Sequence, residues 1–302
     1  MRVLLIGYGS IGRRHEEVLS SFSTIEEIHI VTKQALPDKV TFKNLQEVDN
    51  LKQYDYIVIA SETYKHFEQL KYLENHISNK LIFCEKPLFE TDKELTILKN
   101  RVLVGYVLRF HPLMQKLKHY LKNEKILSST IVCGQYLPTW RKEVDYKTSY
   151  SASKAQGGGV LLDLSHEIDY AQWLFGDMID IQSYQLKVSD LEIDSDDLVT
   201  LISKTQKGVI VTMSIDYISK ITHRRIIVNT IENTYELDFI KNLLIQKDRN
   251  GLEQKHKTKN LERNTMFEKM HASILSNQHS ACTYKEGQSV MKTISTIQRQ
   301  SK

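Results

Sequence analysis

Three short stretches of the sequence carry residue types that could do chemistry. The first is the glycine-rich turn Gly7-Tyr8-Gly9-Ser10-Ile11-Gly12, which is suited to holding phosphates. The second, Cys84-Glu85-Lys86-Pro87, places a lysine directly after a predicted strand. The third runs from Gly157 to Asp169 and contains an aspartate and a histidine, Asp163 and His166. In this order they predict a dinucleotide site, a cationic group and an acid–base pair, the parts of a nicotinamide-dependent oxidoreductase.

The glycine turn lies between two elements that make it informative. Residues 1–6 form a continuous apolar run, as expected for a buried parallel strand, and 13–19 form a helix. In such a turn Gly7 permits the tight bend, Gly9 lets a pyrophosphate approach, and Gly12 lets helix and strand pack closely. We expect the helix start at Ser10 and Ile11 to face the phosphates with its backbone N–H groups. The alternative is a glycine-rich turn without a ligand.

The second predicted strand, 27–32, ends where an adenine ribose should lie. An NAD site commonly has Asp or Glu there, but this sequence has Thr32 and Lys33. A hydroxyl and a cation suit a 2′-phosphate, and Arg13 and Arg14 could add charge, so we predict NADP(H) over NAD(H). The alternative is that Lys33 is an ordinary solvated loop lysine.

Further apolar runs alternate with helical segments and predict a parallel, doubly wound sheet. The additional strands are expected at 54–60, 80–84 and 102–107. Ligands of such sheets bind at the carboxyl ends of the strands. Ser61, Glu85 and Lys86 all fall at such ends, so we assign them to the cofactor site. For Lys86 the alternative is a surface Lys-Pro turn.

The acid–base pair is expected on one helix, because 160–175 shows helical apolar spacing before Gly176. Asp163 and His166 are three residues apart and would share a helix face. A histidine is a natural proton acceptor near neutral pH, and a neighbouring aspartate can fix its tautomer. The preceding glycines would let the helix approach a ligand. The alternative is a histidine that only packs.

These three stretches resemble the glucose-fructose oxidoreductase, inositol dehydrogenase and rhizopine-catabolism family, Gfo/Idh/MocA, over essentially the whole chain. Ser61 to His66 resembles the family's loop near the nicotinamide ribose, which implies cofactor contacts for Ser61, Glu62 and His66. The resemblance implies hydride transfer at a carbon of a sugar, polyol or sugar nucleotide. Lys86 would stabilise the developing alkoxide, His166 would be the acid/base, and Asp163 its helper. Family members commonly have Asp and His four apart with an intervening glycine, whereas here they are three apart.

Residues on either side of the predicted domain boundary could bind the substrate. Arg109 and His111 could hold a carboxylate or phosphate, and Trp140, Arg141 and Tyr150 could stack on and hydrogen-bond a sugar. With a resemblance to capsule-type family members, these residues suggest an anionic sugar or sugar nucleotide of surface-polysaccharide metabolism. The alternative is that the arginines form structural ion pairs.

The expected fold class is α/β, with an N-terminal Rossmann dinucleotide-binding domain at 1–112. A C-terminal α+β domain at 113–302 is expected to contribute a large open, mostly antiparallel sheet, and a homodimer or homotetramer through that sheet. At 302 residues and a net charge of +4, the chain shows no nucleic-acid motif, no membrane span and no metal-ligand spacing. With three irregularly spaced cysteines and no leader, we expect a cytoplasmic protein.

Two other interpretations stay open at this point. The first is a non-catalytic dinucleotide sensor or partner protein, since fold does not fix function. The second is a redox-neutral enzyme whose tightly bound NAD is oxidised and re-reduced in each cycle.

Overall fold

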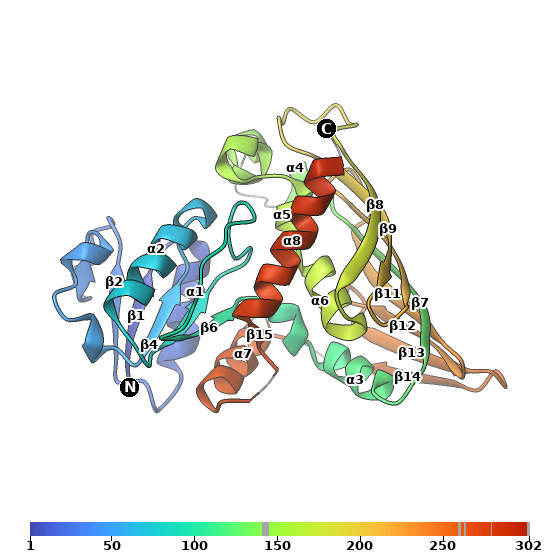
Figure 1. The fold of residues 1–302 in the computed structure, drawn as a ribbon, viewed down its shortest axis with the longest axis horizontal. Helices are drawn as coiled ribbons and strands as arrows, with labels where there is room; N and C mark the ends of the chain where they lie inside the picture. Colours follow the sequence, from blue (N-terminus) through green and yellow to red (C-terminus); the bar gives the residue numbers. More distant parts are fainter. Residues whose placement is uncertain (141–144, 259–260, 263, 279, 301–302) are drawn as a thin grey trace. The chain divides into compact units, whose positions relative to one another are not determined.

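The computed structural model describes residues 1–140, 145–258, 261–262, 264–278 and 280–300. Two compact units make up the chain (Figure 1). The first contains Met1–Phe110 and Glu262–Gln288, and the second contains His111–Leu261 and Ser289–Lys302. The sequence predicted a boundary near 112 and assigned all of 113–302 to the second domain. The structure differs because residues 262–288 return to the first unit, where they add a helix and an edge strand.

The first unit contains a seven-stranded sheet in the order β15-β6-β5-β4-β1-β2-β3. Strands β1 to β6 run parallel, and only β15 is antiparallel to its neighbour. The strands are β1 (Arg2–Ile6), β2 (Glu27–Val31), β3 (Thr41–Phe42), β4 (Tyr56–Ile59), β5 (Leu81–Cys84), β6 (Arg101–Val104) and β15 (Cys282–Thr283). The expected Rossmann arrangement is therefore confirmed.

Helices α1 (Ser10–Ser20) and α7 (Thr265–Leu275) pack on one face of this sheet and share a single core cluster with β1, β2 and β4. The buried side of α1 carries Gly12, His15, Val18 and Leu19, a spacing that repeats along one helix face. Helix α2 (Thr63–His76) follows β4, and a short 3₁₀ turn (Val107–Phe110) follows β6.

The second unit contains an eight-stranded sheet in the order β14-β13-β12-β11-β7-β10-β9-β8. Only the pair β7 and β10 is parallel, so the predicted, mostly antiparallel sheet is confirmed. Its strands are β7 (Ile126–Gly134), β8 (Met178–Leu186), β9 (Leu198–Thr205), β10 (Ile210–Asp216), β11 (His223–Thr230), β12 (Asn233–Asp238), β13 (Leu243–Asp248) and β14 (Glu253–Lys257).

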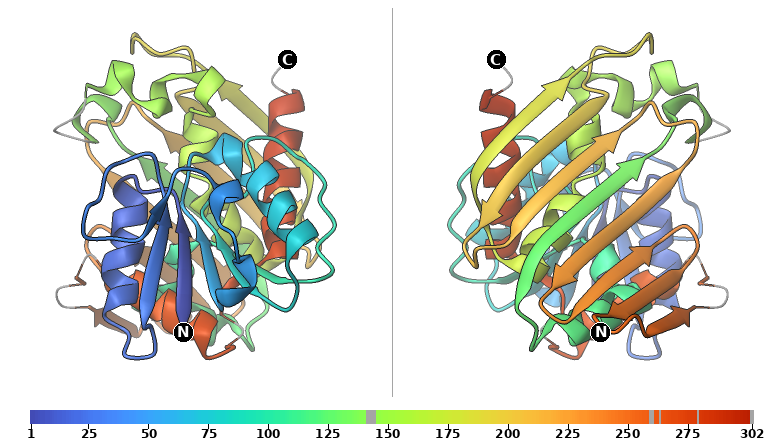
Figure 2. Two further views of the ribbon diagram at one scale, coloured as in Figure 1. Left: turned by 90° about the vertical axis from the view of Figure 1, so that its left-hand side faces the viewer. Right: turned by 90° about the vertical axis from the view of Figure 1, so that its right-hand side faces the viewer.

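Helices α3 (Pro112–Leu121), α5 (Val160–Asp163) and α6 (His166–Phe175) lie on one face of this sheet, and α4 (Leu137–Trp140) follows β7 (Figure 1). The other face, toward the viewer in Figure 2 (right), is covered by no helix of the described part of the unit. Helix α8 (Tyr284–Gln300) begins in the first unit, and its residues from Ser289 onward belong to the second. Thr283 and Glu286 form a reciprocal capping box at its start.

In the described part of the chain, no helix combines the length and the apolar character needed to cross a bilayer.

Candidate active site

The turn between β1 and α1 contains three glycines, and the structure explains each of them differently. Gly7 has a φ of +95°, and a Cβ there would lie 2.5 Å from the backbone nitrogen of Ser61. A Cβ on Gly12 would lie 2.3 Å from the carbonyl oxygen of Gly7. The protein itself therefore excludes side chains at both positions. Gly9 differs, because no protein atom lies within 4 Å of the position its Cβ would take.

The space in front of Gly9 fits the approach of a dinucleotide. Gly9 has a φ of −77°, so its backbone conformation does not require glycine either. It is the N-cap of α1, no side chain caps the helix start, and the first turn contains no acidic residue. The N–H groups at the helix start, where Ser10 and Ile11 lie, are thus positioned to bind an anion such as a pyrophosphate.

Thr32 and Lys33 directly follow β2, as predicted. Thr32 is half-buried, and its hydroxyl accepts a hydrogen bond from the backbone N–H of Gln34 at 3.2 Å. Lys33 is exposed. The Gln34 side chain donates to the carbonyl of Tyr8 at 2.9 Å, which ties this turn to the glycine turn. The strand end therefore presents a hydroxyl and an ammonium where NAD-specific sites have a carboxylate.

The loops after β4 and β5 are joined by His66, which lies in the first turn of α2 and is 1% exposed. Its Nδ1 lies 3.1 Å from the carbonyl oxygen of Pro87, and its Nε2 lies 3.1 Å from that of Ser61. Burial lowers the pKa of His66 and so favours the neutral ring, which has one N–H and donates to only one of these two carbonyl oxygens at a time. The cofactor contact predicted for His66 stays a prediction, and the position of the ring behind both loops indicates that it holds them together.

Ser61 and Glu62 lie at the start of α2. The Ser61 hydroxyl donates to the side-chain oxygen of Gln69 at 2.7 Å. Glu62 is exposed, and its carboxylate pairs with Lys65 at 2.8 Å. Ser61 is brought against Gly7 by the tight packing described above, so it borders the glycine turn, as the sequence predicted for residues at the carboxyl ends of neighbouring strands.

Glu85 and Lys86 follow β5. Glu85 is 7% exposed, and its Oε2 accepts a hydrogen bond from the backbone N–H of Lys86 at 2.9 Å. The Lys86 side chain is half-buried, and the peptide bond to Pro87 is cis. The predicted cofactor contact of Glu85 stays a prediction. Its carboxylate is directed inward, and so we treat Glu85 as a support for the Lys86 backbone.

Arg109 and His111 were expected to reach a substrate, and this expectation stays a prediction. Arg109 is 2% exposed, and its guanidinium pairs with Glu286 at 3.0 Å within the first unit. His111 is also 2% exposed and caps α3, because its Nδ1 accepts from the backbone N–H of Leu113. Its Nε2 then carries the proton, which it donates to Asn242 at 3.1 Å. Both side chains therefore serve internal contacts.

Asp163 and His166 do not share one continuous helix, contrary to the sequence prediction. Helix α5 ends at Asp163, and α6 begins at His166. At the joint the backbone bonds tighten from i→i−4 to i→i−3, from Ser165 to Leu162 and from Glu167 to Leu164. Asp163 is 5% exposed and His166 is half-buried. Apolar periodicity continues across the joint, so the sequence pattern could not reveal it.

Two hydroxyl groups that the sequence analysis missed hold the Asp163 carboxylate. Ser151 and Tyr217 both donate to its Oδ2, at 2.6 Å and 2.5 Å. Tyr217 is fully buried, and burial together with the Asp163 charge raises its pKa well above the ordinary value, so it remains a donor. The Trp140 ring lies 5.8 Å from the Tyr217 ring, and Tyr150 is 41% exposed. Aromatic side chains thus gather beside this carboxylate.

The glycines before α5 have a different explanation from the predicted one. A Cβ on Gly158 would lie 2.1 Å from the carbonyl oxygen of Tyr150. Gly159 has a φ of +120°, and its Cβ would lie 2.2 Å from a carboxylate oxygen of Asp196. Gly158 therefore admits the close approach of the Tyr150–Ser151 segment, whose Ser151 contacts Asp163, and Gly159 admits the close approach of Asp196. The sequence could not distinguish this from an approach to a ligand.

A buried ion pair fixes the start of α6 on the sheet. Glu167 is fully buried, and Arg224 of β11 donates to it twice, from Nε at 2.6 Å and from Nη2 at 2.9 Å. This two-point contact fixes orientation as well as distance. His166 is the adjacent residue, so its backbone position is set by this pair.

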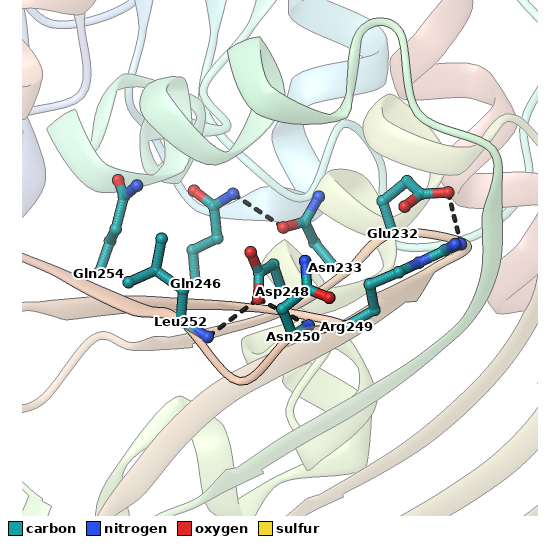
Figure 3. Close-up of a pocket in the computed structure, with 8 residues that line it drawn as sticks. All are labelled: Glu232, Asn233, Gln246, Asp248, Arg249, Asn250, Leu252 and Gln254. Atoms are coloured by element: carbon teal, nitrogen blue, oxygen red, sulfur yellow. Dashed lines mark hydrogen bonds and ion pairs between the residues drawn. The ribbon is translucent and has the colours of Figure 1, made fainter.

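Arg141, predicted to bind substrate, lies outside the described residues. A surface pocket at the β11–β12 and β13–β14 hairpins contains none of the predicted site residues (Figure 3). Its polar side chains pair with one another, as Gln246 does with Asn233 and Arg249 with Glu232. Among the described residues, no group of three or more His, Cys, Asp or Glu side chains is arranged to hold a metal ion.

With this geometry in place, family comparisons identify both parts of the chain. Residues 1–102 match the oxidoreductase family with an NAD-binding Rossmann fold, and residues 114–236 match the GFO/IDH/MocA C-terminal domain. The chain belongs to the Gfo/Idh/MocA oxidoreductase family. Its first unit is therefore an NAD-binding domain of an oxidoreductase.

Individual relatives are distant. 2,7-Anhydro-N-acetylneuraminate hydratase of Escherichia coli is 22% identical over 146 residues, which is 46% of this chain and 38% of that protein. The match thus spans about two fifths of the curated relative. Levoglucosan dehydrogenase in complex with NADH has a TM-score of 0.83 at 17% identity, covering 100% of this chain and 96% of that one. UDP-N-acetylglucosamine 3-dehydrogenase from Acidithiobacillus ferrooxidans has a TM-score of 0.77 at 15% identity, covering 100% and 97%. At these identities the solved structures show the fold alone.

Proposed function

We propose that this protein transfers a hydride between a nicotinamide dinucleotide and a carbon of a sugar that bears a hydroxyl or keto group. The observation that carries the proposal is the open space in front of Gly9, at an uncapped helix start where neither the packing nor the backbone requires glycine. The nicotinamide, when bound, supplies the hydride acceptor or donor. Support for a sugar comes from the similar folds of levoglucosan dehydrogenase and UDP-N-acetylglucosamine 3-dehydrogenase.

The chain's own residues would supply charge and proton transfer. Lys86 presents an ammonium that stabilises negative charge on the reacting oxygen, and His166 accepts or donates the proton. Asp163, held by Ser151 and Tyr217, keeps a fixed carboxylate in the segment that carries His166. Trp140 and Tyr150 offer apolar faces on which a sugar ring can stack.

The anionic sugar expected from the sequence has less support than the sugar itself. Arg109 is enclosed and ion-paired, so we base no charge preference on it. A panel of substrates should therefore include neutral anhydrosugars and polyols beside sugar nucleotides and acidic sugars. Turnover of neutral polyols alone would contradict the anionic preference and leave the dehydrogenase proposal in place.

For the cofactor we propose a preference for NADP(H), supported by Thr32 and Lys33 at the end of β2. Fluorescence or calorimetric titration with NADPH, NADP, NADH and NAD tests it. Tighter binding of NAD(H) would refute the preference. Failure of all four to bind would refute the oxidoreductase proposal itself.

Variants of the two proposed catalytic residues test the mechanism. Lys86→Ala and His166→Ala should each lower kcat at least about 100-fold while cofactor affinity changes little, because electrostatic stabilisation of the reacting oxygen and general acid–base catalysis each contribute about that much. The exposed Lys71 of α2 provides a matched control as Lys71→Ala. Full turnover by Lys86→Ala or His166→Ala would overturn the assigned roles.

A redox-neutral reaction is the second candidate, and the similarity to a hydratase favours it, since hydration changes no net oxidation state. In that case nucleotide would remain bound through purification, and product would form without NADH or NADPH appearing in solution. Stoichiometric release of reduced cofactor would exclude it.

We also propose a cytoplasmic homodimer or homotetramer assembled through the uncovered sheet face of the second unit. Tyr184, Ile202 and Ile210 on that face are 72%, 47% and 40% exposed. Their sequence neighbours Leu201 and Val211 point to the opposite, buried face. Light scattering that shows a monomer at micromolar concentration would contradict the assembly.

A further inference from the structure

Two buried histidines of the first unit lie outside the proposed catalytic group. His15 is in α1 and His271 is in α7, and both are 0% exposed. His15 Nε2 lies 2.9 Å from Glu85 Oε1, and His15 Nδ1 lies 2.9 Å from His271 Nε2. His271 Nδ1 lies 2.9 Å from the hydroxyl of Tyr56 in β4. We call these four residues the buried histidine network.

The protons of the network have one arrangement when both histidines are neutral and Glu85 is ionised. Tyr56 then donates to His271 Nδ1, and His271 Nε2 donates to His15 Nδ1. His15 Nε2 donates to the Glu85 carboxylate. Each contact then contains one proton, and every donation runs in the direction from Tyr56 to Glu85. Burial is the main cause that holds the pKa of His271 well below its ordinary value, in agreement with a neutral His271 ring.

An additional proton would reverse this order. If His15 became doubly protonated, it would donate to His271 Nε2, and His271 Nδ1 would then donate to the Tyr56 oxygen. The Tyr56 hydroxyl proton would need another acceptor, although Tyr56 is fully buried. Phe83 and Phe267 enclose the His15 ring, with centroids 5.1 Å and 5.5 Å away.

The network ends on the residue that supports Lys86. The other oxygen of Glu85 accepts from the backbone N–H of Lys86 at 2.9 Å. Gly105 packs against the same carboxylate so closely that a Cβ there would lie 2.9 Å from the carboxyl carbon. The Glu85 carboxylate is therefore fixed by His15 at one oxygen, by the Lys86 amide at the other, and by the close packing of Gly105 against it.

We propose that His15 and His271 are positioning residues for Lys86, which act by holding the Glu85 carboxylate against the Lys86 backbone amide. This inference rests on the proposed function, in which Lys86 acts on the substrate oxygen. Neither histidine contacts the reacting atoms in this scheme. Helix α7, which carries His271 and lies far along the sequence, thereby contributes to the geometry of the loop after β5.

The test combines amide exchange with kinetics in the full-length protein. Hydrogen–deuterium exchange resolved to the Lys86 amide reports on the Glu85–Lys86 bond, and the next residue, Pro87, adds no amide proton of its own. His15→Leu and His271→Leu should speed exchange there about 10-fold and lower kcat about 10- to 100-fold, with dinucleotide Kd within about threefold of wild type. His271→Gln keeps a side-chain donor for His15. Its exchange rate at Lys86 and its kcat should therefore both lie close to those of the wild type.

The chain offers a matched control in His29. Its Nδ1 lies 2.9 Å from the Tyr54 hydroxyl in the same unit, so His29→Leu removes the same kind of histidine–tyrosine contact away from Glu85. It should change neither exchange at Lys86 nor kcat. If the leucine variants do not fold, Glu85→Gln provides a variant of equal size, because its NH₂ group must face either the His15 or the Lys86 donor. It should produce the same faster exchange.

The outcomes separate this inference from the proposed function. Unchanged exchange and kcat in folded His15→Leu or Glu85→Gln would overturn it. Equal impairment of His271→Gln and His271→Leu would assign the histidine to packing and overturn it too. If the wild-type protein turns over no sugar, the proposed function fails, whereas the exchange comparison still decides whether the network holds the Lys86 amide.

Discussion

Replacing Gly9 with alanine should separate cofactor binding from folding. The added methyl meets no protein atom within 4 Å, and the φ of −77° is open to alanine. Alanine at an N-cap is less favourable than glycine by up to about 1 kcal/mol, and the lower entropy of the unfolded chain offsets about 0.4–1 kcal/mol of this. The free energy of unfolding should therefore change by less than about 1 kcal/mol.

Cofactor affinity should fall much more. A methyl group forced into a closely packed phosphate contact costs about 1–3 kcal/mol, which corresponds to a roughly 5- to 150-fold higher Kd. Titration of NAD(P)H fluorescence gives Kd, and urea unfolding gives stability. Gly12→Ala is the comparison, because its Cβ would lie 2.3 Å from the Gly7 carbonyl oxygen and should destabilise the fold by several kcal/mol. Wild-type affinity in Gly9→Ala would refute the assignment of this space to a dinucleotide.

Three further predictions concern charge. Lys33→Asp should move the preference toward NAD(H), with at least a tenfold loss of NADP(H) affinity in the same titration; an unchanged ratio of the two Kd values would remove Lys33 from the site. Arg224→Met should lower the free energy of unfolding by about 3–5 kcal/mol, because it leaves the Glu167 charge buried and unpaired. The double variant Arg224→Met with Glu167→Leu should recover much of that loss, as measured by urea unfolding. Burial lowers the pKa of His66 and His271 in the folded protein. Below about pH 6.5 the unfolded chain therefore binds more protons than the folded one. The free energy of unfolding should then fall with decreasing pH, by up to about 1.4 kcal/mol per pH unit for each histidine. Equal stability at pH 7.5 and 5.5 would contradict the neutral rings.

The sequence predicted elements best where one periodicity and one local motif agreed. The strand before Gly7, the turn and the helix after it follow local rules, and so do most strands of the second unit, whose alternation matches a one-sided sheet. Helix α3 was not predicted, because it directly follows residues that were interpreted as substrate-binding.

Contacts between distant segments could not be derived from periodicity. Nothing local indicates that Tyr217 and Ser151 meet at Asp163, or that Arg109 finds Glu286. His15 did carry a signal, since it lies on the buried side of α1 with Val18 and Leu19, and a buried histidine needs a polar partner. One of its two polar partners, His271, is brought to it by the return of 262–288 to the first unit, and the other, Glu85, follows β5.

This return has a consequence for synthesis. The first unit lacks α7 and the antiparallel edge strand β15 until residue 288 has left the ribosome, after about 150 residues of the second unit. At 5–20 residues per second, synthesis of residues 111–288 takes roughly 9–36 s. During that interval the nascent chain exposes the apolar surface that Phe267, Met270 and Ile274 later cover, and β6 remains an open edge. The dinucleotide domain is therefore completed only after residues 111–261 of the second unit have been synthesised.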